Sequence, residues 1–349
     1  MAQIDFNDGN WERVFYDDFT ISRYWDVSDW YSMPDLYWRA RPERHITHGS
    51  LEYQIYQYDH CLFDAIDGTM KLIAEYDINA IKYHNYALPE MMHGHYPNTY
   101  GQNDGLYYFS GEIDTRTKYR YGYFEIRCKL PTHQGAFPAF WLYDSNTSGS
   151  DQYYEEIDIF EYTWSIAETP NHIGNPTPHG IPDYYTFTTG IYFNDTSTSF
   201  SSYARNFPTL SATGNDLSNW HTYSCEWLPE RVVWYCDGLI VNEYLETQNI
   251  PHRPLTLKTN YAINKHYQHD GTIWQGPDTM EIDYIRVFQL NWDCNTDEII
   301  SCQTDLNNFD YAVKRSISIT PTSGEITIGC NEKVTYRVSN SFEQLDLLQ

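Results

Sequence analysis

The sequence has few basic residues for its length. It contains 22 Lys and Arg against 48 Asp and Glu, which gives a formal net charge of −26. Nucleic acids and anionic membrane surfaces are bound through Lys and Arg, so this balance argues against both as partners. A heavily sulfated or uronic polymer would need a local basic patch to overcome the negative field. A neutral or lightly charged ligand is therefore favoured.

Long hydrophobic runs are also absent. No stretch approaches the ~18 apolar residues of a membrane span, and the first residues lack the basic and then apolar pattern of a secretion signal. The seven cysteines include no Cys-x-x-Cys pair of the metal-binding kind, and their odd number leaves at least one free thiol. Cys294 and Cys302 could be bridged in an oxidising compartment, whereas Cys128 shares the phase of Phe124 and Ile126 and is expected to be buried.

No helical periodicity extends beyond a turn or two. Instead, short alternating strands and turns recur, as in Trp220 to Trp227, which predicts an all-β protein with two antiparallel sheets packed as a sandwich. Residues 1–290 are expected to form this large domain. After Leu290 the texture changes, and residues 291–349 are predicted to hold a linker and a small β module, or a fragment of one, that is too small to bury a core alone.

Aromatic residues are abundant, at 17% of the chain with 33 Tyr and 11 Trp. This exceeds what a core of this size uses, so many rings are expected at the surface. Exposed rings mark binding sites, and the C–H faces of sugars stack well on them. The alternative, that Tyr serves as a strand former with a solvated hydroxyl, stays open for many of them.

Three acids lie in the strand-forming stretch Tyr154-Glu-Glu-Ile-Asp-Ile-Phe-Glu-Tyr-Thr-Trp164. Glu156 and Asp158 share a face, whereas unbroken alternation sends Glu161 to the other. A β-bulge at Ile159-Phe160 would return Glu161 to the face of the other two. Acids this close cannot all ionise cheaply, and a raised acid beside an ionised carboxylate is what glycosidic bond cleavage requires. The alternative is a solvated strand face in an acid-rich chain.

The stretch Glu156-Ile-Asp-Ile-Phe-Glu161 resembles the Glu-x-Asp-x-x-Glu signature of glycoside hydrolase family 16, which contains laminarinases, agarases, porphyranases and κ-carrageenases. Further stretches resemble the same family in the same order over roughly residues 11–290: Ser110-Gly-Glu-Ile-Asp-Thr with Tyr121-Gly-Tyr-Phe-Glu-Ile-Arg127, Phe137-Pro-Ala-Phe-Trp-Leu142, Trp220-His-Thr-Tyr-Ser-Cys-Glu-Trp227 with Trp234-Tyr-Cys-Asp-Gly238, and Met280-Glu-Ile-Asp-Tyr-Ile-Arg-Val287.

The resemblance implies a curved jelly roll with a substrate cleft on its concave face, and an endo-acting hydrolase that retains the anomeric configuration. By motif position Glu156 is the nucleophile, Glu161 the acid and base, and Asp158 the residue that orients Glu156. Glu155 points the opposite way and is expected to be dispensable. A non-catalytic carbohydrate-binding protein is the competing class, although such proteins lose the acids, and transglycosylases of the family use a shorter, unbulged signature.

The expected partner is a polysaccharide, bound by a monomer. Laminarinase-like members place His residues where Thr188 and Tyr192 stand here, and this departure, with the long loops at 83–106 and 166–185, favours an algal β-galactan such as agarose. A β-1,3-glucan is the alternative. Substrate contacts are expected from these residues: Trp141, Trp164, Tyr192, Asn260, His266 and Trp274.

Two of these contacts have alternatives. Trp141 could instead pack in the core beneath the site. The strand from Leu255 places Lys258, Asn260 and Asn264 on one face, which we assign to the cleft floor, although an edge strand with a solvated face would show the same pattern.

No cofactor is required for the chemistry that the resemblance implies. The family often binds a structural calcium near its entry and closing strands, and Asp18 and Asp283 are the matching positions; carboxylate oxygens suit calcium. The chain looks like a mature form, and a secreted, periplasmic or cell-surface location is expected for an enzyme that acts on polysaccharides.

Overall fold

The protein is described here by a computed structural model. The described residues are 6, 11–20, 38–40, 45–46, 52, 54–64, 66–77, 108–131, 135–146, 150, 152–162, 187–195, 199–206, 217–246, 249–263 and 277–290, with short strand segments between 299 and 335.

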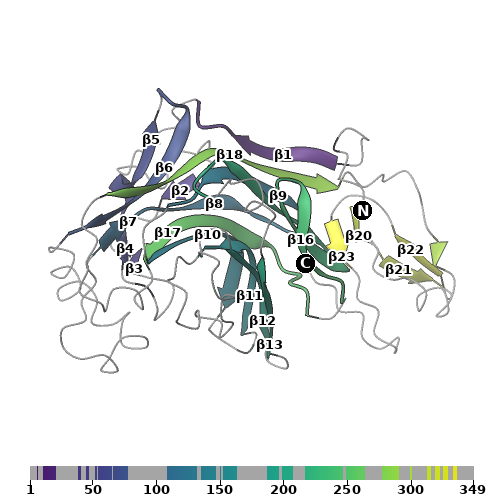
Figure 1. The fold of residues 1–349 in the computed structure, drawn as a ribbon. Helices are drawn as coiled ribbons and strands as arrows, with labels where there is room; N and C mark the ends of the chain where they lie inside the picture. The colour runs from purple at the N-terminus through teal and green to yellow at the C-terminus, as the bar shows by residue number, and fades with distance from the viewer. Residues whose placement is uncertain are drawn as a thin grey trace.

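Two curved sheets build the large domain (Figure 1). The first sheet has the strand order β16-β15-β14-β9-β18-β6-β7-β4-β3, with β1 beside β18 and β5 beside β6. Its strands are β1 (Trp11–Asp17), β3 (His45–Ile46), β4 (Gln54–Tyr56), β5 (Cys61–Asp64), β6 (Thr69–Tyr76), β7 (Tyr108–Ser110), β9 (Gly122–Lys129), β14 (His221–Leu228), β15 (Arg231–Cys236), β16 (Leu239–Tyr244) and β18 (Asp278–Leu290).

The second sheet has the order β13-β12-β11-β10-β17-β8-β2. Its strands are β2 (Trp38–Ala40), β8 (Glu112–Tyr119), β10 (Ala136–Asn146), β11 (Tyr153–Glu161), β12 (Phe187–Asp195), β13 (Ser199–Asn206) and β17 (Leu255–Ile263). Every pairing in the two sheets is antiparallel except the pairing of β4 with β7. The predicted all-β jelly-roll class is confirmed.

The core lies between the two sheets. Apolar residues that alternate along the central strands point into it, such as Phe124, Ile126 and Cys128 of β9. Phe160 of β11 meets Tyr223 of β14 with ring centroids 4.7 Å apart, and Cys128 of β9 is fully buried, as predicted. The outer face of the first sheet carries a smaller apolar cluster of Tyr123, Val233, Tyr235 and Phe288, and the outer face of the second sheet holds the predicted acids.

Gly111 fixes the connection between β7 and β8. A Cβ at this position would lie 2.4 Å from the carbonyl oxygen of His60, so any larger residue would force the backbone apart. His60 belongs to a short 3-10 helix, η2 (Tyr58–His60). The close approach anchors the start of β8, which carries Glu112 and Asp114.

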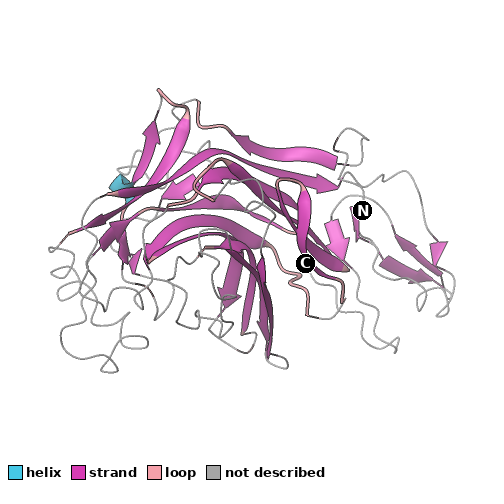
Figure 2. Ribbon diagram, in the orientation of Figure 1, coloured by secondary structure: helices cyan, strands magenta, loops and turns pink. Residues whose placement is uncertain are grey.

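Strand dominates the described part of the chain (Figure 2). No helix among the described residues is long and apolar enough to cross a membrane. Short strands form where the C-terminal β module is predicted: β19 (Ile299–Ile300), β20 (Val313–Arg315), β21 (Ile319–Thr322), β22 (Glu325–Ile328) and β23 (Lys333–Thr335). The division at residue 290 stays a prediction.

Candidate active site

The register of β11 contains the predicted bulge. On one side Asp158 pairs with Gly190 and Glu161 with Thr188, so three steps along β11 match two steps along β12. On the β10 side the register shifts at the same place. Directly paired residues of antiparallel strands point to the same side. The extra residue therefore brings Glu161 to the face of Glu156 and Asp158, as the sequence argument predicted.

The environment of the three acids raises two of their pKa values. Burial raises the pKa of Asp158, which is 2% exposed, and the charges of Glu161 and Glu156 and a hydrogen bond with Glu156 raise it further. Burial likewise raises the pKa of Glu161 to about 8, with added contributions from the charges of Glu156 and Glu52. These are the two physical causes, desolvation and like charge, that keep a carboxylic acid protonated near neutral pH.

Glu156 has a tyrosine as its neighbour on the same face. The hydroxyl of Tyr154 donates a hydrogen bond to Oε2 of Glu156, and burial and the charge of Glu156 raise the pKa of that hydroxyl. The ring of Tyr154 packs edge-on against Tyr143, at 5.2 Å between centroids. A donor fixed on this carboxylate stabilises its charged form and its orientation.

Trp141 lies on the face of the three acids, since it pairs with Asp158 across β10 and β11. Its Nε1 donates to Oδ1 of Asn260 at 2.8 Å, and Nδ2 of Asn260 donates to the hydroxyl of Tyr56 at 2.8 Å. The Tyr56 hydroxyl lies 3.4 Å from Oε2 of Glu52. The charge of Glu52 also contributes to the raised pKa of Glu161. Trp141 is 7% exposed and shares the face of the three acids, which we call the cleft face after the cleft that the family resemblance implies. Its role in binding substrate stays a prediction.

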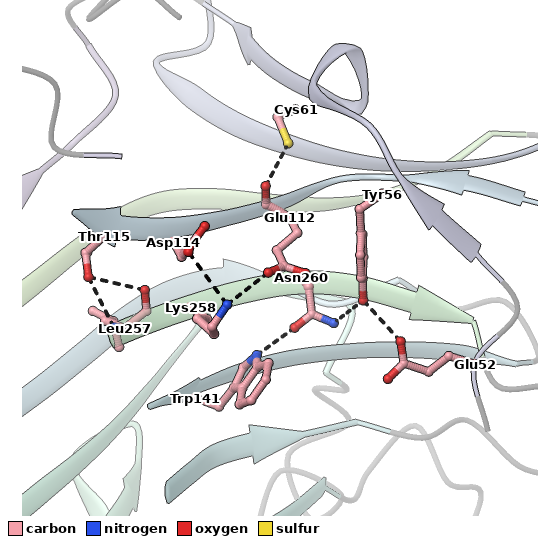
Figure 3. Close-up of polar contacts among 10 residues, drawn as sticks. All are labelled: Glu52, Tyr56, Cys61, Glu112, Asp114, Thr115, Trp141, Leu257, Lys258 and Asn260. Atoms are coloured by element: carbon pink, nitrogen blue, oxygen red, sulfur yellow. Dashed lines mark hydrogen bonds and ion pairs between the residues drawn. The ribbon is translucent and has the colours of Figure 1, made fainter. Parts of the chain in front are cut away.

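A buried charge cluster lies beside Trp141 (Figure 3). Lys258 Nζ is 3.1 Å from Oε1 of Glu112 and 3.7 Å from Oδ2 of Asp114, and the side chains of both acids are fully buried. The ammonium also lies 5.4 Å from the centre of the Trp141 ring. Since β17 is flanked by β10 and β8, the edge-strand alternative for Lys258 and Asn260 is excluded.

The opposite face of β11 is structural. Glu155 is fully buried, accepts backbone N–H bonds from His252 and Arg253 at 2.9 Å each, and pairs with the Arg253 guanidinium at 2.9 Å. It points away from the cleft, as predicted. The expectation that it is dispensable concerns chemistry alone, because removal of this buried carboxylate would take an acceptor from two backbone N–H groups and an ion pair from the partly exposed Arg253.

Trp234 of β15 supports the bulge from the first sheet. Its Nε1 donates to the backbone carbonyl of Asp158 at 2.8 Å, and the side chain is 1% exposed. A bulge leaves ladder groups unpaired. This hydrogen bond satisfies one of them and ties the catalytic strand to the sheet behind it.

The remaining predicted contacts are placed as follows. Tyr192 of β12 pairs directly with Glu156 and so lies on the cleft face. Trp164, His266 and Trp274 lie outside the described residues, as do Asn264, Cys294, Cys302 and the loops at 83–106 and 166–185. Their roles stay predictions.

The two residues proposed to bind calcium have other partners. Asp283 pairs with the guanidinium of Arg127, and Oδ1 of Asp18 accepts bonds from the hydroxyl of Thr20 at 2.7 Å and from its amide at 3.2 Å. Among the described residues, no group of three or more His, Cys, Asp or Glu is placed to hold a metal ion. The calcium at Asp18 and Asp283 stays a prediction.

Sequence reasoning missed several residues of this face: Tyr143, Glu52, Tyr56 and the pair Glu112 and Asp114. The signal for the last pair was present, because Ser110-Gly-Glu-Ile-Asp-Thr alternates acids on one face of a strand. Their partner Lys258 could be assigned only once the register of β8 with β17 was known.

Comparison with known proteins agrees with this geometry. The sequence profile of glycosyl hydrolases family 16 matches residues 75–286. The chain is 29% identical to the endo-1,3-1,4-beta-glycanase EglC of Rhizobium meliloti (strain 1021) over 196 residues, which is 55% of this chain and 36% of that protein. It is also 29% identical to the kappa-carrageenase of Pseudoalteromonas carrageenovora over 209 residues, which is 53% of this chain and 48% of that protein.

Among solved structures, an endo-glucanase of glycoside hydrolase family 16 from Bacteroides ovatus superposes with a TM-score of 0.53 at 19% identity, covering 78% of this chain and 99% of that one. This likeness supports the fold. The family profile spans more than half of the chain and contains the bulged strand with its three acids. The chain belongs to glycoside hydrolase family 16.

Proposed function

We propose that the protein is an endo-acting β-glycosidase that hydrolyses a polysaccharide with retention of anomeric configuration. The observation that carries the proposal is the bulged strand. It places three acids on one face, and one of them, Glu161, has a pKa of about 8. An acid that stays protonated at neutral pH beside a second carboxylate is the pair that such a reaction needs.

In this mechanism Glu156 attacks the anomeric carbon and Glu161 protonates the leaving glycosidic oxygen. A covalent glycosyl-enzyme forms as the C–O bond to the leaving group breaks. Glu161, now ionised, then takes a proton from water, which attacks the anomeric carbon and releases Glu156. The hydrogen bond from Tyr154 holds Glu156 in its charged, attacking form. Asp158 is held by burial and two neighbouring charges as a proton-bearing partner of Glu156.

For the substrate, we propose an algal β-galactan of the agarose or porphyran type, with β-1,3-glucan as the second candidate. The relatives include both a kappa-carrageenase and an endo-1,3-1,4-beta-glycanase, so they do not by themselves select between a galactan and a glucan. Lys258 is a cation of the cleft face that is already paired with two carboxylates, so it is not available to bind a sulfate group. Within the galactans, this pairing and the net charge of −26 favour agarose, which is neutral, over the sulfated members.

A non-catalytic carbohydrate-binding protein is the second candidate function, favoured by the aromatic and amide groups of the cleft face. The two candidates differ in whether bonds are broken. We further propose that the protein acts outside the cytoplasm, where polysaccharides of this size are found, and that it acts as a monomer.

A digestion panel tests the function. Agarose, porphyran, κ-carrageenan, laminarin and mixed-linkage glucan are incubated with the protein, and the oligosaccharide profile and the reducing ends are measured. The proposal expects a ladder of oligosaccharides from agarose or porphyran, and none from the Glu156→Gln variant. Binding to a polymer without release of reducing ends would support the carbohydrate-binding alternative.

A further inference from the structure

The first sheet carries a pocket, called the outer pocket below, on the face that points away from the core. It has a volume of about 340 Å³. It is lined by Phe6, Tyr123, Glu125, Thr222, Tyr235, Asp237, Gly238, Tyr284 and Arg286. Tyr123 and Glu125 alternate along β9 with the core residues Phe124 and Ile126, so the pocket and the catalytic strand lie on opposite sides of the sandwich.

A buried polar network forms the floor of this outer pocket. Glu125 is 5% exposed. It accepts hydrogen bonds from the Tyr284 hydroxyl at 2.8 Å and from Arg286 Nε at 2.7 Å, and its Oε2 lies 3.0 Å from the Tyr123 hydroxyl. The Tyr123 hydroxyl also lies 2.7 Å from Oγ of Ser224. Such a network is rigid, because each group is held by at least one partner.

Other polar groups at the pocket remain available to a ligand. Arg286 uses Nε and Nη2 on Glu125, which leaves its Nη1 group without a partner among the described residues. The Tyr235 hydroxyl likewise has no hydrogen bond to any residue that the structure describes. The Asp237 carboxylate at the rim is 41% exposed; its Oδ2 lies 2.8 Å from Nδ1 of the buried His221, and its Oδ1 accepts from the Thr222 amide at 2.9 Å. The guanidinium of Arg286, the hydroxyl of Tyr235 and the carboxylate of Asp237 therefore border the same pocket.

The walls of the pocket are aromatic. Tyr123 and Tyr235 lie with ring centroids 6.0 Å apart, and Phe6 packs on Tyr123 at 4.8 Å. Arg286 lies over the Tyr284 ring at 5.2 Å. Apolar ring faces combined with a few fixed polar groups are the usual composition of a small-molecule site.

We propose that this outer pocket is a second carbohydrate-binding site, which holds a neutral sugar unit of the polysaccharide that the cleft cleaves. The identity of the ligand rests on the proposed function. The pocket volume suits one or two sugar rings, since ligand sites begin at about 300 Å³. Ring faces match sugar C–H faces, and the Arg286 and Asp237 groups match the hydroxyls at the edge of a sugar.

Charge excludes the other small ligands. Glu125 and Asp237 against Arg286 leave one negative charge at the pocket, in a chain with a net charge of −26, so an anion is disfavoured. A cation would find Glu125 already paired with Arg286, and the oxygens of Asp237 already bonded to His221 and to the Thr222 amide, so the described residues of the pocket offer no unpaired carboxylate to hold it. A neutral, hydroxyl-rich ligand remains. A second binding site on the far side of the sandwich would hold the enzyme on an insoluble polymer between cleavage events.

The test uses the full chain with Glu156→Gln, which removes hydrolysis, and affinity electrophoresis in gels that contain agarose, laminarin or mixed-linkage glucan. Trp141→Ala is added to weaken the cleft. Adding Tyr235→Ala is expected to weaken the remaining retention about threefold to tenfold, because the change removes one hydrogen-bonding and stacking contact with the sugar. Because Tyr235→Ala also removes packing against Tyr123, Tyr235→Phe is measured beside it and is expected to give a smaller loss in the same direction.

Leu239→Ala is the control variant, since Leu239 is 62% exposed beside the pocket and does not line it. It should leave retention unchanged. In the active enzyme, Tyr235→Ala should slow degradation of insoluble polymer and leave turnover of a short aryl glycoside unchanged.

The outcomes separate the two proposals. If the protein is retained on none of the three polymers, or if neither Tyr235 variant changes its retention, the proposed binding role of the outer pocket is wrong. The proposed chemistry of the cleft is not affected by that result. Retention that depends on Tyr235, in a protein that cleaves no polysaccharide, supports the outer pocket and overturns the proposed hydrolase.

Discussion

Lys258 offers the sharpest test of the cleft floor. The change Lys258→Met keeps the length and apolar stem of the side chain and removes its charge. Glu112 and Asp114 then lose the cation that stands 3.1 and 3.7 Å from them. Both acids have fully buried side chains. The variant therefore contains two buried carboxyl groups that have lost the Lys258 cation.

The expected cost is large. Breaking a buried ion pair by removal of one partner typically lowers the free energy of unfolding by about 3–5 kcal/mol, because the remaining charge stays desolvated. A loss of this size corresponds to a fall in Tm of roughly 5–8 °C for a domain of about 290 residues. The Trp141 ring also loses a cation at 5.4 Å, so activity on polymer should fall by more than the folded fraction does.

Denaturant unfolding and thermal melts measure the effect, with Lys71→Met as the matched control. Lys71 also contacts two acids, Asp64 at 2.7 Å and Asp67 at 3.3 Å, but Asp67 is 61% exposed. The control should cost at most about 1 kcal/mol. The triple change Lys258→Met, Glu112→Gln, Asp114→Asn should recover much of the loss. If Lys258→Met were no worse than Lys71→Met, the reading of a buried charge cluster would be wrong.

The remaining predictions concern the acids and their support. The value of kcat/KM on polymer should fall above about pH 8, where Glu161 releases its proton, and a pH–rate profile without this limb would contradict its role as the acid. The raised pKa of Glu161 in the folded state also means that its contribution to stability is complete below about pH 4.5 and is lost as the pH rises to about 8, which titrated unfolding measures. Tyr154→Phe removes a donor from the charged Glu156 and should lower kcat on polymer by roughly tenfold; an unchanged kcat would count against this contact. Trp234→Phe should lower the free energy of unfolding by about 1–3 kcal/mol and also lower kcat, because it frees the carbonyl in the bulge. Trp227→Phe is the control, because it loses a hydrogen bond of 2.9 Å from Trp227 Nε1 to the carbonyl of Pro251. It should lower the free energy of unfolding by a similar amount and leave kcat unchanged.

The fold and the bulge were predictable because each follows from a short-range rule. Alternation with period two identifies strands, and chemistry requires that Glu161 share the face of Glu156, which only an extra residue in the strand can achieve. The register confirms that extra residue between Asp158 and Glu161. The face assigned to Lys258 and Asn260 followed from the same alternation.

Contacts between strands far apart in the chain could not be predicted. The partners of Lys258 lie more than a hundred residues earlier and depend on a register shift between β17 and β8. The outer pocket combines side chains of β9, β14, β15 and β18, whose order in the sheet a single sequence does not give. The bond from Trp234 to the bulge crosses between the two sheets, and no local pattern marks it.

The central claim is the division of roles between Glu156 and Glu161, and chemical rescue tests it directly. In Glu161→Ala, an aryl glycoside with a good leaving group should still form the covalent intermediate, and added azide should restore turnover and give a glycosyl azide of retained configuration. Glu156→Gln should show no such retained product. Rescue of Glu156→Gln in place of Glu161→Ala would reverse the roles, and an inverted product from the unmodified enzyme would contradict the account.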